Sequence, residues 1–297
     1  MLAAAVLIGT PGCNRRGSAQ GSESHAGSDT QLTAAPPQTA PPEEAAAPEQ
    51  AQNALPALSA SERQTGISAD WTIPRRYQGK RISTRVRYFP HKLLALTFDD
   101  GPNPELTPTV LKYLAAYGAH ATFFVLGQAA QAHPELLRAI AAGGHTIGSH
   151  SYTHPATCTA DQARSELART AAAIQKATGE RPTCFRPPYG IVDSKLTHLA
   201  LSQGYCVFTW TISSADTAKI DAAGIAHNVI HTPNPGDLVL MHDGPGHRET
   251  VKALPQILKE LGAAGFRFVS LPELLRAWDQ WLATSGTKSA PGAATTQ

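Results

Sequence analysis

The sequence predicts an α/β fold, specifically a distorted or incomplete (β/α) barrel with seven or eight strands, preceded by a disordered N-terminal tail. Short apolar segments alternate with helical patterns from residue 93 onward, which is typical of a parallel sheet. Glycines stand where most of these helices should end, as left-handed C-terminal caps require. Ionisable residues follow several of the strands, at the face where barrel enzymes carry their chemistry.

Seven segments have the apolar, β-compatible composition of strands. They are 93–98, 121–126, 145–149, 183–186, 205–210, 237–242 and 266–270. The helical stretches between and after them are 107–117, 134–142, 161–178, 193–202, 221–231, 249–264 and 272–283. No GxGxxG or P-loop follows the first strand, so a barrel fits better than an open nucleotide-binding sheet.

One globular domain with flanking tails fits a chain of 297 residues that is 42% hydrophobic. Residues 14–70 are rich in Pro and Ala with almost no aromatic residue, so we expect a disordered tether. The predicted domain spans 71–285, and its basic opening, 71–90, suits either a strand or a flap. Residues 286–297 are predicted to be a second disordered tail.

The charge balance bears on possible partners. The formal net charge is +2, and no dense Lys/Arg cluster occurs, which argues against a nucleic-acid partner. No sequence feature implies a protein partner.

The first residues, 1–13, form a signal-like segment. A short apolar run ends in small residues and Cys13, which resembles the end of a bacterial lipoprotein signal. We therefore expect an exported protein, extracellular or anchored at the cell envelope, with lipidation of Cys13 left open. A disordered apolar tail is the alternative. The run is too short to span a bilayer, which takes roughly 20 helical residues.

The remaining cysteines are Cys158, Cys184 and Cys206. In an oxidising compartment this odd count permits one disulfide and one leftover thiol. Burial as small apolar side chains is equally compatible with the sequence.

The segment 93–102, LLALTFDDGP, is the centre of the predicted site. A buried strand there delivers Asp99 and Asp100 at its end, directly before a Gly-Pro turn. Once the strand breaks, both carboxylates can turn toward one pocket, where one holds a metal and the other a proton. Taken alone, an Asp-Asp-Gly-Pro run is more often an ordinary turn.

Two histidines four residues apart, His150 and His154, follow another predicted strand. One helical turn would direct both imidazoles to a common point. With one oxygen of Asp99 or Asp100 they would form a two-His, one-carboxylate set that leaves a position for water, as catalytic zinc sites do. A lone HxxxH pattern is weak, but its place after a strand and a Gly-Ser turn strengthens it.

Two more predicted strands end in ionisable residues. Arg186 opens an Arg-Pro-Pro-Tyr-Gly turn, whose rigidity would fix the guanidinium and expose backbone N–H groups to a developing oxyanion. The alternative is an ordinary ion pair beside a structural turn. His242 ends a fully apolar strand, and the alternative there is a packed, unreactive histidine.

Together these motifs resemble the polysaccharide deacetylase family, carbohydrate esterase family 4, which includes chitin, chitooligosaccharide and peptidoglycan deacetylases. Four motifs occur in the family's order within roughly 92–275. They are TFDDG at 97–101, HSYTH at 150–154, RPPYG at 186–190 and LMH at 240–242. The remaining family motif is degraded, because Asp216 is kept but Thr217 stands where the family often has Trp. Loss of that aromatic wall bears on substrate preference.

The resemblance implies a metal centre and a base. Asp100, His150 and His154 would hold a divalent metal, most often Zn²⁺. Asp99 would be the general base, and Arg186 would orient it.

The resemblance also implies an acid and a substrate pocket. His242 would be the general acid, with Asp216 beside it to favour the imidazolium. The backbone N–H of Tyr189 would stabilise the oxyanion. Leu240 would line the acetyl pocket, and Trp210 belongs to the same substrate-binding group.

The implied activity is removal of N-acetyl groups from N-acetylglucosamine units of a cell-wall or chitin-like polysaccharide, such as peptidoglycan or a chitin oligomer. One alternative is an O-acetyl ester hydrolase acting on acetylated xylan. Another is a non-catalytic glycan-binding barrel. The matched acid and base argue against the last, because binding alone needs neither.

Overall fold

The computed structural model describes residues 71–231 and 233–285. The signal-like segment 1–13 with Cys13, the tether 14–70 and the tail 286–297 lie outside the described residues. Their predicted roles, and the domain limits drawn from them, therefore stay predictions.

In the described part of the chain, no helix combines the length and the apolar composition that a bilayer crossing requires.

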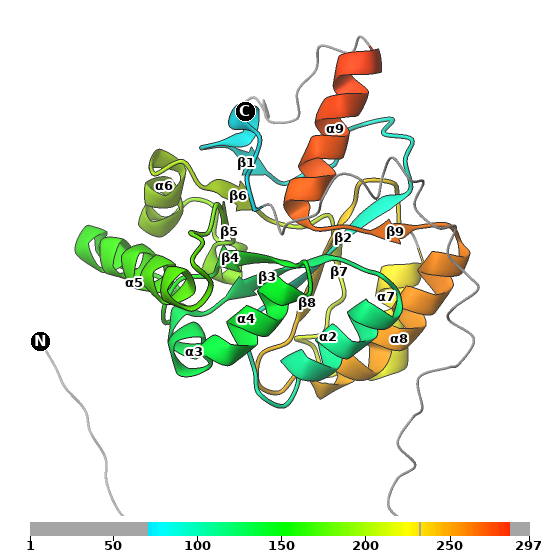
Figure 1. The fold of residues 1–297 in the computed structure, drawn as a ribbon, viewed down its shortest axis with the longest axis horizontal. Coiled ribbons are helices and arrows are strands. Elements are labelled where there is room, and N and C mark those ends of the chain that lie inside the picture. The colour runs from blue at the N-terminus through cyan, green and yellow to red at the C-terminus, as the bar shows by residue number, and fades with distance from the viewer. Residues whose placement is uncertain (1–70, 232, 286–297) are drawn as a thin grey trace, which may run out of the picture. The chain divides into compact units, whose positions relative to one another are not determined.

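A curled parallel sheet forms the centre of the fold (Figure 1). Its strands follow the order β1-β6-β5-β4-β3-β2-β8-β7, and β9 pairs with β2 beside this path. Their bounds are β1 Arg81–Ile82, β2 Leu93–Asp99, β3 Ala121–Val125, β4 Thr146–Ser149, β5 Cys184–Phe185, β6 Cys206–Phe208, β7 Ile212–Ser213, β8 Leu238–His242 and β9 Arg267–Phe268. The path ends at β1 and β7 without pairing them, which confirms the predicted incomplete barrel.

Helices connect the strands and surround the sheet (Figure 1). Their bounds are α2 Thr107–Ala116, α3 Gly127–Ala132, α4 Pro134–Ala142, α5 Ala160–Thr178, α6 Lys195–Ser202, α7 Ala222–Ile230, α8 Arg248–Ala263 and α9 Leu271–Ser285, with short 3-10 helices η2 Arg75–Tyr77 and η3 Pro188–Gly190. The longest, α5, begins with a capping box between Thr159 and Gln162 and ends at Gly179, whose φ is 84°.

Side-chain alternation along the strands separates an outer core from an inner one. In β2, Leu94, Leu96 and Phe98 belong to the outer cluster, which also contains buried residues of α2 and α8. Ala95 belongs to the inner cluster. By the same alternation Asp99 faces inward, so the strand delivers its carboxylate to the inside of the barrel at the strand's carboxyl end.

The inner core is filled by the first and last described segments. Tyr77 of η2 and Trp278 of α9 are buried in the same cluster as Phe208 of β6. The lead-in 71–90, left open between strand and flap, contains a strand, because β1 pairs with β6. Trp278 lies against Gly236, just before β8 begins, so α9 packs at the amino end of that strand, whereas His242 stands at its carboxyl end.

All seven predicted strands are present, most of them shortened at their ends. The sequence left β1 open within the lead-in and missed β7, and each is only two residues long, too short to carry an alternating pattern. The strand β7 matters for function, since it pairs with β8 and brings the residues that follow it to the end of that strand.

The three cysteines of the described ranges, Cys158, Cys184 and Cys206, are free thiols. Cys184 and Cys206 are register partners on β5 and β6 and are buried. Burial raises the pKa of Cys184 to about 12 and that of Cys206 well above its ordinary value. These two therefore pack as small apolar side chains, which is one of the two alternatives that the sequence left open.

Candidate active site

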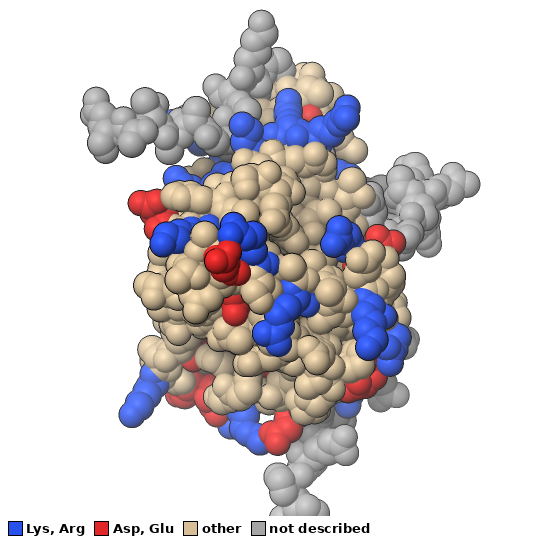
Figure 2. Space-filling model, turned by 90° about the vertical axis from the view of Figure 1, so that its left-hand side faces the viewer, with Lys and Arg blue, Asp and Glu red and all other residues tan. Residues whose placement is uncertain are grey.

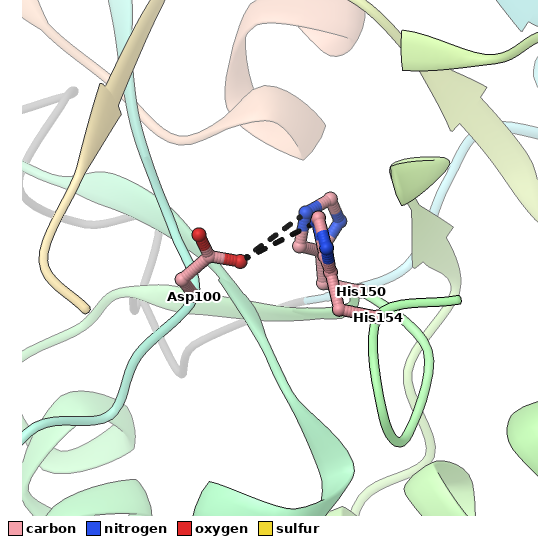
Figure 3. A group of neighbouring side chains, drawn as sticks. All are labelled: Asp100, His150 and His154. Atoms are coloured by element: carbon pink, nitrogen blue, oxygen red, sulfur yellow. Dashed lines mark ion pairs between the residues drawn. The ribbon is translucent and has the colours of Figure 1, made fainter. Parts of the chain in front are cut away.

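Two adjacent carboxylates at the end of β2 have different surroundings. Asp99 is almost fully buried, and its Oδ1 accepts a hydrogen bond from Arg186 Nη1 at 2.8 Å. Asp100 has a φ of 70°, a left-handed conformation that breaks the strand's alternation. Its carboxylate therefore leaves the strand direction and points to a pair of imidazoles (Figure 3).

These imidazoles belong to His150 and His154, just past β4 (Figure 3). Asp100 Oδ1 lies 3.6 Å from His150 Nε2 and 3.7 Å from His154 Nε2. His150 Nδ1 lies 2.7 Å from the carbonyl oxygen of Arg186. Because a carbonyl only accepts, Nδ1 carries a proton, so Nε2, on the side of Asp100, is the nitrogen with a lone pair when the ring is neutral.

The helical turn predicted for 150–154 is wrong. These residues form a loop in which Ser151 (φ 69°) and His154 (φ 61°) take left-handed conformations. Ser151 Oγ accepts the backbone N–H of His154 at 3.1 Å, and Glu166 of α5 accepts two other backbone N–H groups of the loop. Side-chain acceptors thus satisfy the backbone N–H groups that a helical turn would have paired. The loop, held in this way by α5, brings the two imidazoles together.

A buried cation holds the inner carboxylate in place. The fully buried Arg186 donates from Nη1 to Thr97 Oγ1 at 2.7 Å and to Asp99 Oδ1 at 2.8 Å. Its Nη2 donates to the carbonyl of Thr209 at 3.0 Å, and the guanidinium lies 4.3 Å from the centre of the Phe124 ring. A charge buried this deeply needs such partners, so the Arg186–Asp99 pair is a buried ion pair within the site and not an ordinary surface ion pair.

A second carboxylate-imidazole pair ends β8. His242 Nδ1 lies 2.8 Å from Asp216 Oδ1, while Asp216 Oδ2 accepts the backbone N–H of His242 and the Thr250 hydroxyl, both at 2.8 Å. Burial acts to lower the pKa of His242, but the hydrogen bond to Asp216 and the charges of Asp99 and Asp100 outweigh it and raise this pKa overall. With Nδ1 engaged, the Nε2 proton of the imidazolium is the one left to transfer.

Comparison with known proteins points to one family. A sequence model of the family described as polysaccharide deacetylase matches residues 87–208. The peptidoglycan-N-acetylglucosamine deacetylase of Bacillus cereus is 36% identical over 187 residues, covering 62% of this chain and 68% of that protein. The chain belongs to the polysaccharide deacetylase family.

Other family members extend the likeness. A chitooligosaccharide deacetylase of Bradyrhizobium is 34% identical over 215 residues, covering 67% of this chain and 95% of that protein. The crystal structure of a peptidoglycan N-acetylglucosamine deacetylase in complex with a substituted benzamide has a TM-score of 0.63 at 33% identity, and covers 68% of this chain and 94% of that one. The fold and the family are therefore those that the motifs predicted.

Three more predicted residues of the polysaccharide deacetylase site lie around these groups. Tyr189 is 64% exposed with a φ of 57°, and its ring centre is 4.4 Å from that of His154. Leu240 is buried and faces inward on β8, two positions before His242. The ring of Trp210 lies against Gly190, directly after Tyr189, where an added Cβ would come within 2.7 Å of it.

Sequence reasoning missed three residues of this region. Thr97 bonds Arg186 from the strand position two before Asp99. Asp243 is fully buried, and burial raises its pKa to about 7. The ring of His247 stacks on that of His242. Their signals were a polar residue inside an apolar strand, an acid next to His242 and a histidine just before α8.

The donor set formed by Asp100, His150 and His154 fits a divalent cation. Asp100 Oδ1 is buried and has no hydrogen-bond partner among the described residues, and all three donor atoms lie within 4.8 Å of one another. Tetrahedral zinc with bonds of about 2.0–2.2 Å holds its ligand atoms about 3.4 Å apart, close to the distances found here. Burial, and then the neighbouring His150, lower the pKa of His154, which favours the neutral form a ligand needs.

Proposed function

We propose that this protein is a divalent-metal-dependent N-deacetylase, acting on N-acetylglucosamine units of peptidoglycan or a chitin-like glycan, with Zn²⁺ as the metal. One observation carries the proposal. Asp99, held by Arg186, and His242, held by Asp216, are register partners at the ends of the neighbouring strands β2 and β8. Both lie beside the donor set of Asp100, His150 and His154. The relatives named for peptidoglycan and chitooligosaccharide support the substrate class.

Hydrolysis of an acetamide needs an activated water, because the amide carbon is a poor electrophile. A cation held by Asp100, His150 and His154 would lower the pKa of water and polarise the acetyl carbonyl. Arg186 holds Asp99 through Oδ1, while Asp99 Oδ2 lies 3.8 Å from His150 Nε2, on the side of the donor set. We assign Asp99 as the general base that takes a proton from the attacking water.

The second half of the reaction needs a proton on the leaving nitrogen, because an amine anion does not leave. We assign this step to His242 Nε2, since Asp216 binds Nδ1 and favours the imidazolium. We assign the backbone N–H of Tyr189 to the oxyanion, the side chain of Leu240 to the acetyl-binding pocket, and Trp210 to substrate binding. The inward position of Leu240 on the strand that ends in His242 supports this assignment.

An exported or envelope-held enzyme would meet such a glycan directly. The signal-like segment 1–13 ending in Cys13 supports this location. Cys13→Ser should move a lipidated protein from the membrane fraction to the soluble one, and unchanged fractionation would contradict lipidation.

Acetate release tests the proposed function. The purified protein, loaded with Zn²⁺, is incubated separately with peptidoglycan, chitin oligomers and acetylated xylan, and free acetate is measured. We expect acetate from one or both of the N-acetylated glycans, and its loss after chelation. Release from acetylated xylan alone would identify an ester hydrolase, whereas no release from any substrate with metal bound would identify a glycan-binding barrel.

The metal ligands and the base should separate experimentally. His150→Ala should lower metal content and turnover together, because loss of one donor of three weakens both binding and geometry. Asp99→Asn should keep the metal and lose turnover, because an amide cannot accept the proton. Metal analysis of both purified variants checks this, and equal metal loss in the two would mean that Asp99 is a ligand.

The pH profile should depend on Asp216. The acid works when His242 is protonated, so activity falls as pH rises through the pKa of His242. Because Asp216 raises this pKa, Asp216→Asn should lower it and move the alkaline limb of kcat to lower pH. The exposed Asp161→Asn on α5 is the control and should leave the limb in place. A limb unchanged in Asp216→Asn would remove Asp216 from the mechanism.

A further inference from the structure

A second histidine lies flat against the face of the general acid. The ring centres of His242 and His247 are 4.7 Å apart with an interplanar angle of 18°. His247 precedes the first residue of α8, so the chain returns from the end of β8 to place it there. Its Nδ1 is buried, lies 3.9 Å from Asp216 Oδ2 and has no hydrogen-bond partner within the described ranges. The chemistry assigned above does not use this residue.

The stacked arrangement does not suit a second metal centre. Donor atoms of Asp216, His242 and His247 lie within 4.8 Å of one another. A metal ion binds in the plane of each imidazole, where the nitrogen lone pair points. Two nearly parallel stacked planes share no such point, whereas the rings of the first donor set are tilted by 56°. Both oxygens of Asp216 are also already hydrogen-bonded.

The charges around the two rings favour one protonated and one neutral imidazole. Burial, and then the positive His242, lower the pKa of His247 against the opposing influence of Asp216 and Asp100. The pKa of His242 is raised, because Asp216, Asp99 and Asp100 together outweigh its burial. A proton in this cluster therefore resides on His242, and His247 presents a neutral aromatic face to it.

We propose that His247 is a positioning residue for the general acid His242, holding the plane of the imidazolium so that Nδ1 stays on Asp216 and Nε2 faces the leaving nitrogen. The inference rests on the proposed function of His242. One hydrogen bond at Nδ1 fixes a point of the ring but leaves the ring free to tilt about it. The stacked His247 removes that freedom, as packing does for a preorganised acid.

The start of α8 holds both members of the acid pair. His247 packs on His242, and Thr250, in the first turn of α8, donates its hydroxyl to Asp216 at 2.8 Å. One helix end thus orients the imidazole and its carboxylate together. Because the acid acts after the attack on the carbonyl, the effect of His247 should fall on kcat for an amide and not on substrate binding.

Variants of His247 test the inference. His247→Ala should lower kcat on an N-acetylated chitin oligomer by about 10- to 100-fold, since a misplaced catalytic group costs on this scale. KM and metal content should stay unchanged, and hydrolysis of an aryl acetate should change by less than about twofold, because an activated phenolate leaves without a proton. His247→Phe, which keeps a flat ring, should restore most of the amide activity.

The matched control is His227→Ala. His227 of α7 and His231, directly after that helix, are exposed and form another stacked pair, with ring centres 4.7 Å apart at 27°. Removing one ring there deletes the same chemical group without touching His242, so kinetics should equal those of the unaltered protein. Thermal unfolding of each variant checks that it is folded.

A spectroscopic signal tests the placement without substrate. The Nδ1 proton of His242, hydrogen-bonded to Asp216, should give a downfield NMR signal, identified by its loss in His242→Gln. We expect the signal to broaden or vanish in His247→Ala and to return in His247→Phe.

If the unaltered protein releases no acetate from any glycan, the proposed function fails, and this signal still decides the role of His247. A signal and amide kcat unchanged in His247→Ala, or equal losses on amide and aryl acetate, would overturn the inference.

Discussion

Replacing His242 with alanine should lower kcat for acetamide hydrolysis by about 10² to 10⁴, the usual span for loss of a general acid. The amine must be protonated as it leaves, and we propose His242 Nε2 as the proton source, because Asp216 binds Nδ1 and favours the imidazolium. An activated aryl acetate should retain most of its turnover, because its phenolate is a stable leaving group. The two substrates therefore separate loss of the acid from general damage to the site.

The measurement compares kcat for a chitin oligomer and an aryl acetate in the same preparation, with metal content determined in parallel. His198→Ala is a suitable control, since His198 is an exposed histidine on α6 that pairs with the exposed Asp193 at 3.1 Å. Equal losses on amide and aryl ester in His242→Ala would exclude His242 as the leaving-group acid.

Replacing Arg186 with methionine should lower the free energy of unfolding by roughly 3–5 kcal/mol, as expected when one partner of a buried ion pair is removed. Arg186 is fully buried, and its loss leaves the Asp99 carboxylate and the Thr97 hydroxyl without their donor. Activity should fall as well, because Asp99 is no longer held beside the proposed metal ligands. Urea unfolding of the metal-free protein measures the stability term separately from metal binding.

Two further variants sharpen this test. The exposed pair Arg76–Asp279, at 2.9 Å, offers a control in which Arg76→Ala should cost only about 0–1 kcal/mol. Adding Asp99→Asn to Arg186→Met removes the unpaired charge, so the double variant should recover part of the lost stability. A loss below about 1 kcal/mol in Arg186→Met would mean that water or another group solvates Asp99, and the buried pair would not organise the site.

Much of the site was open to prediction from sequence because its residues stand at strand ends. Asp100, His150 and His154 each follow an apolar segment, and parallel strands bring such positions to one edge. The local conformation at 150–154 was not predictable in this way. A spacing of four residues suits a helical turn. Residues with left-handed backbone and the carboxylate of Glu166 instead form a loop, which also brings the two imidazoles together.

The sequence by itself determined the parallel α/β class, the family and the chemical types at the ends of the strands, because periodicity, turn residues and motifs are local properties of the chain. Only the tertiary structure decided which of these groups meet. Arg186 reaches Asp99 across 87 positions of sequence, and Asp216 reaches His242 across 26. The order of strands sets those contacts, including the two-residue β7 that no pattern reveals, and the return of α8 sets the stack of His247 on His242. Such contacts are absent from any single segment, because they exist only when the sheet has curled and the helices have packed around it.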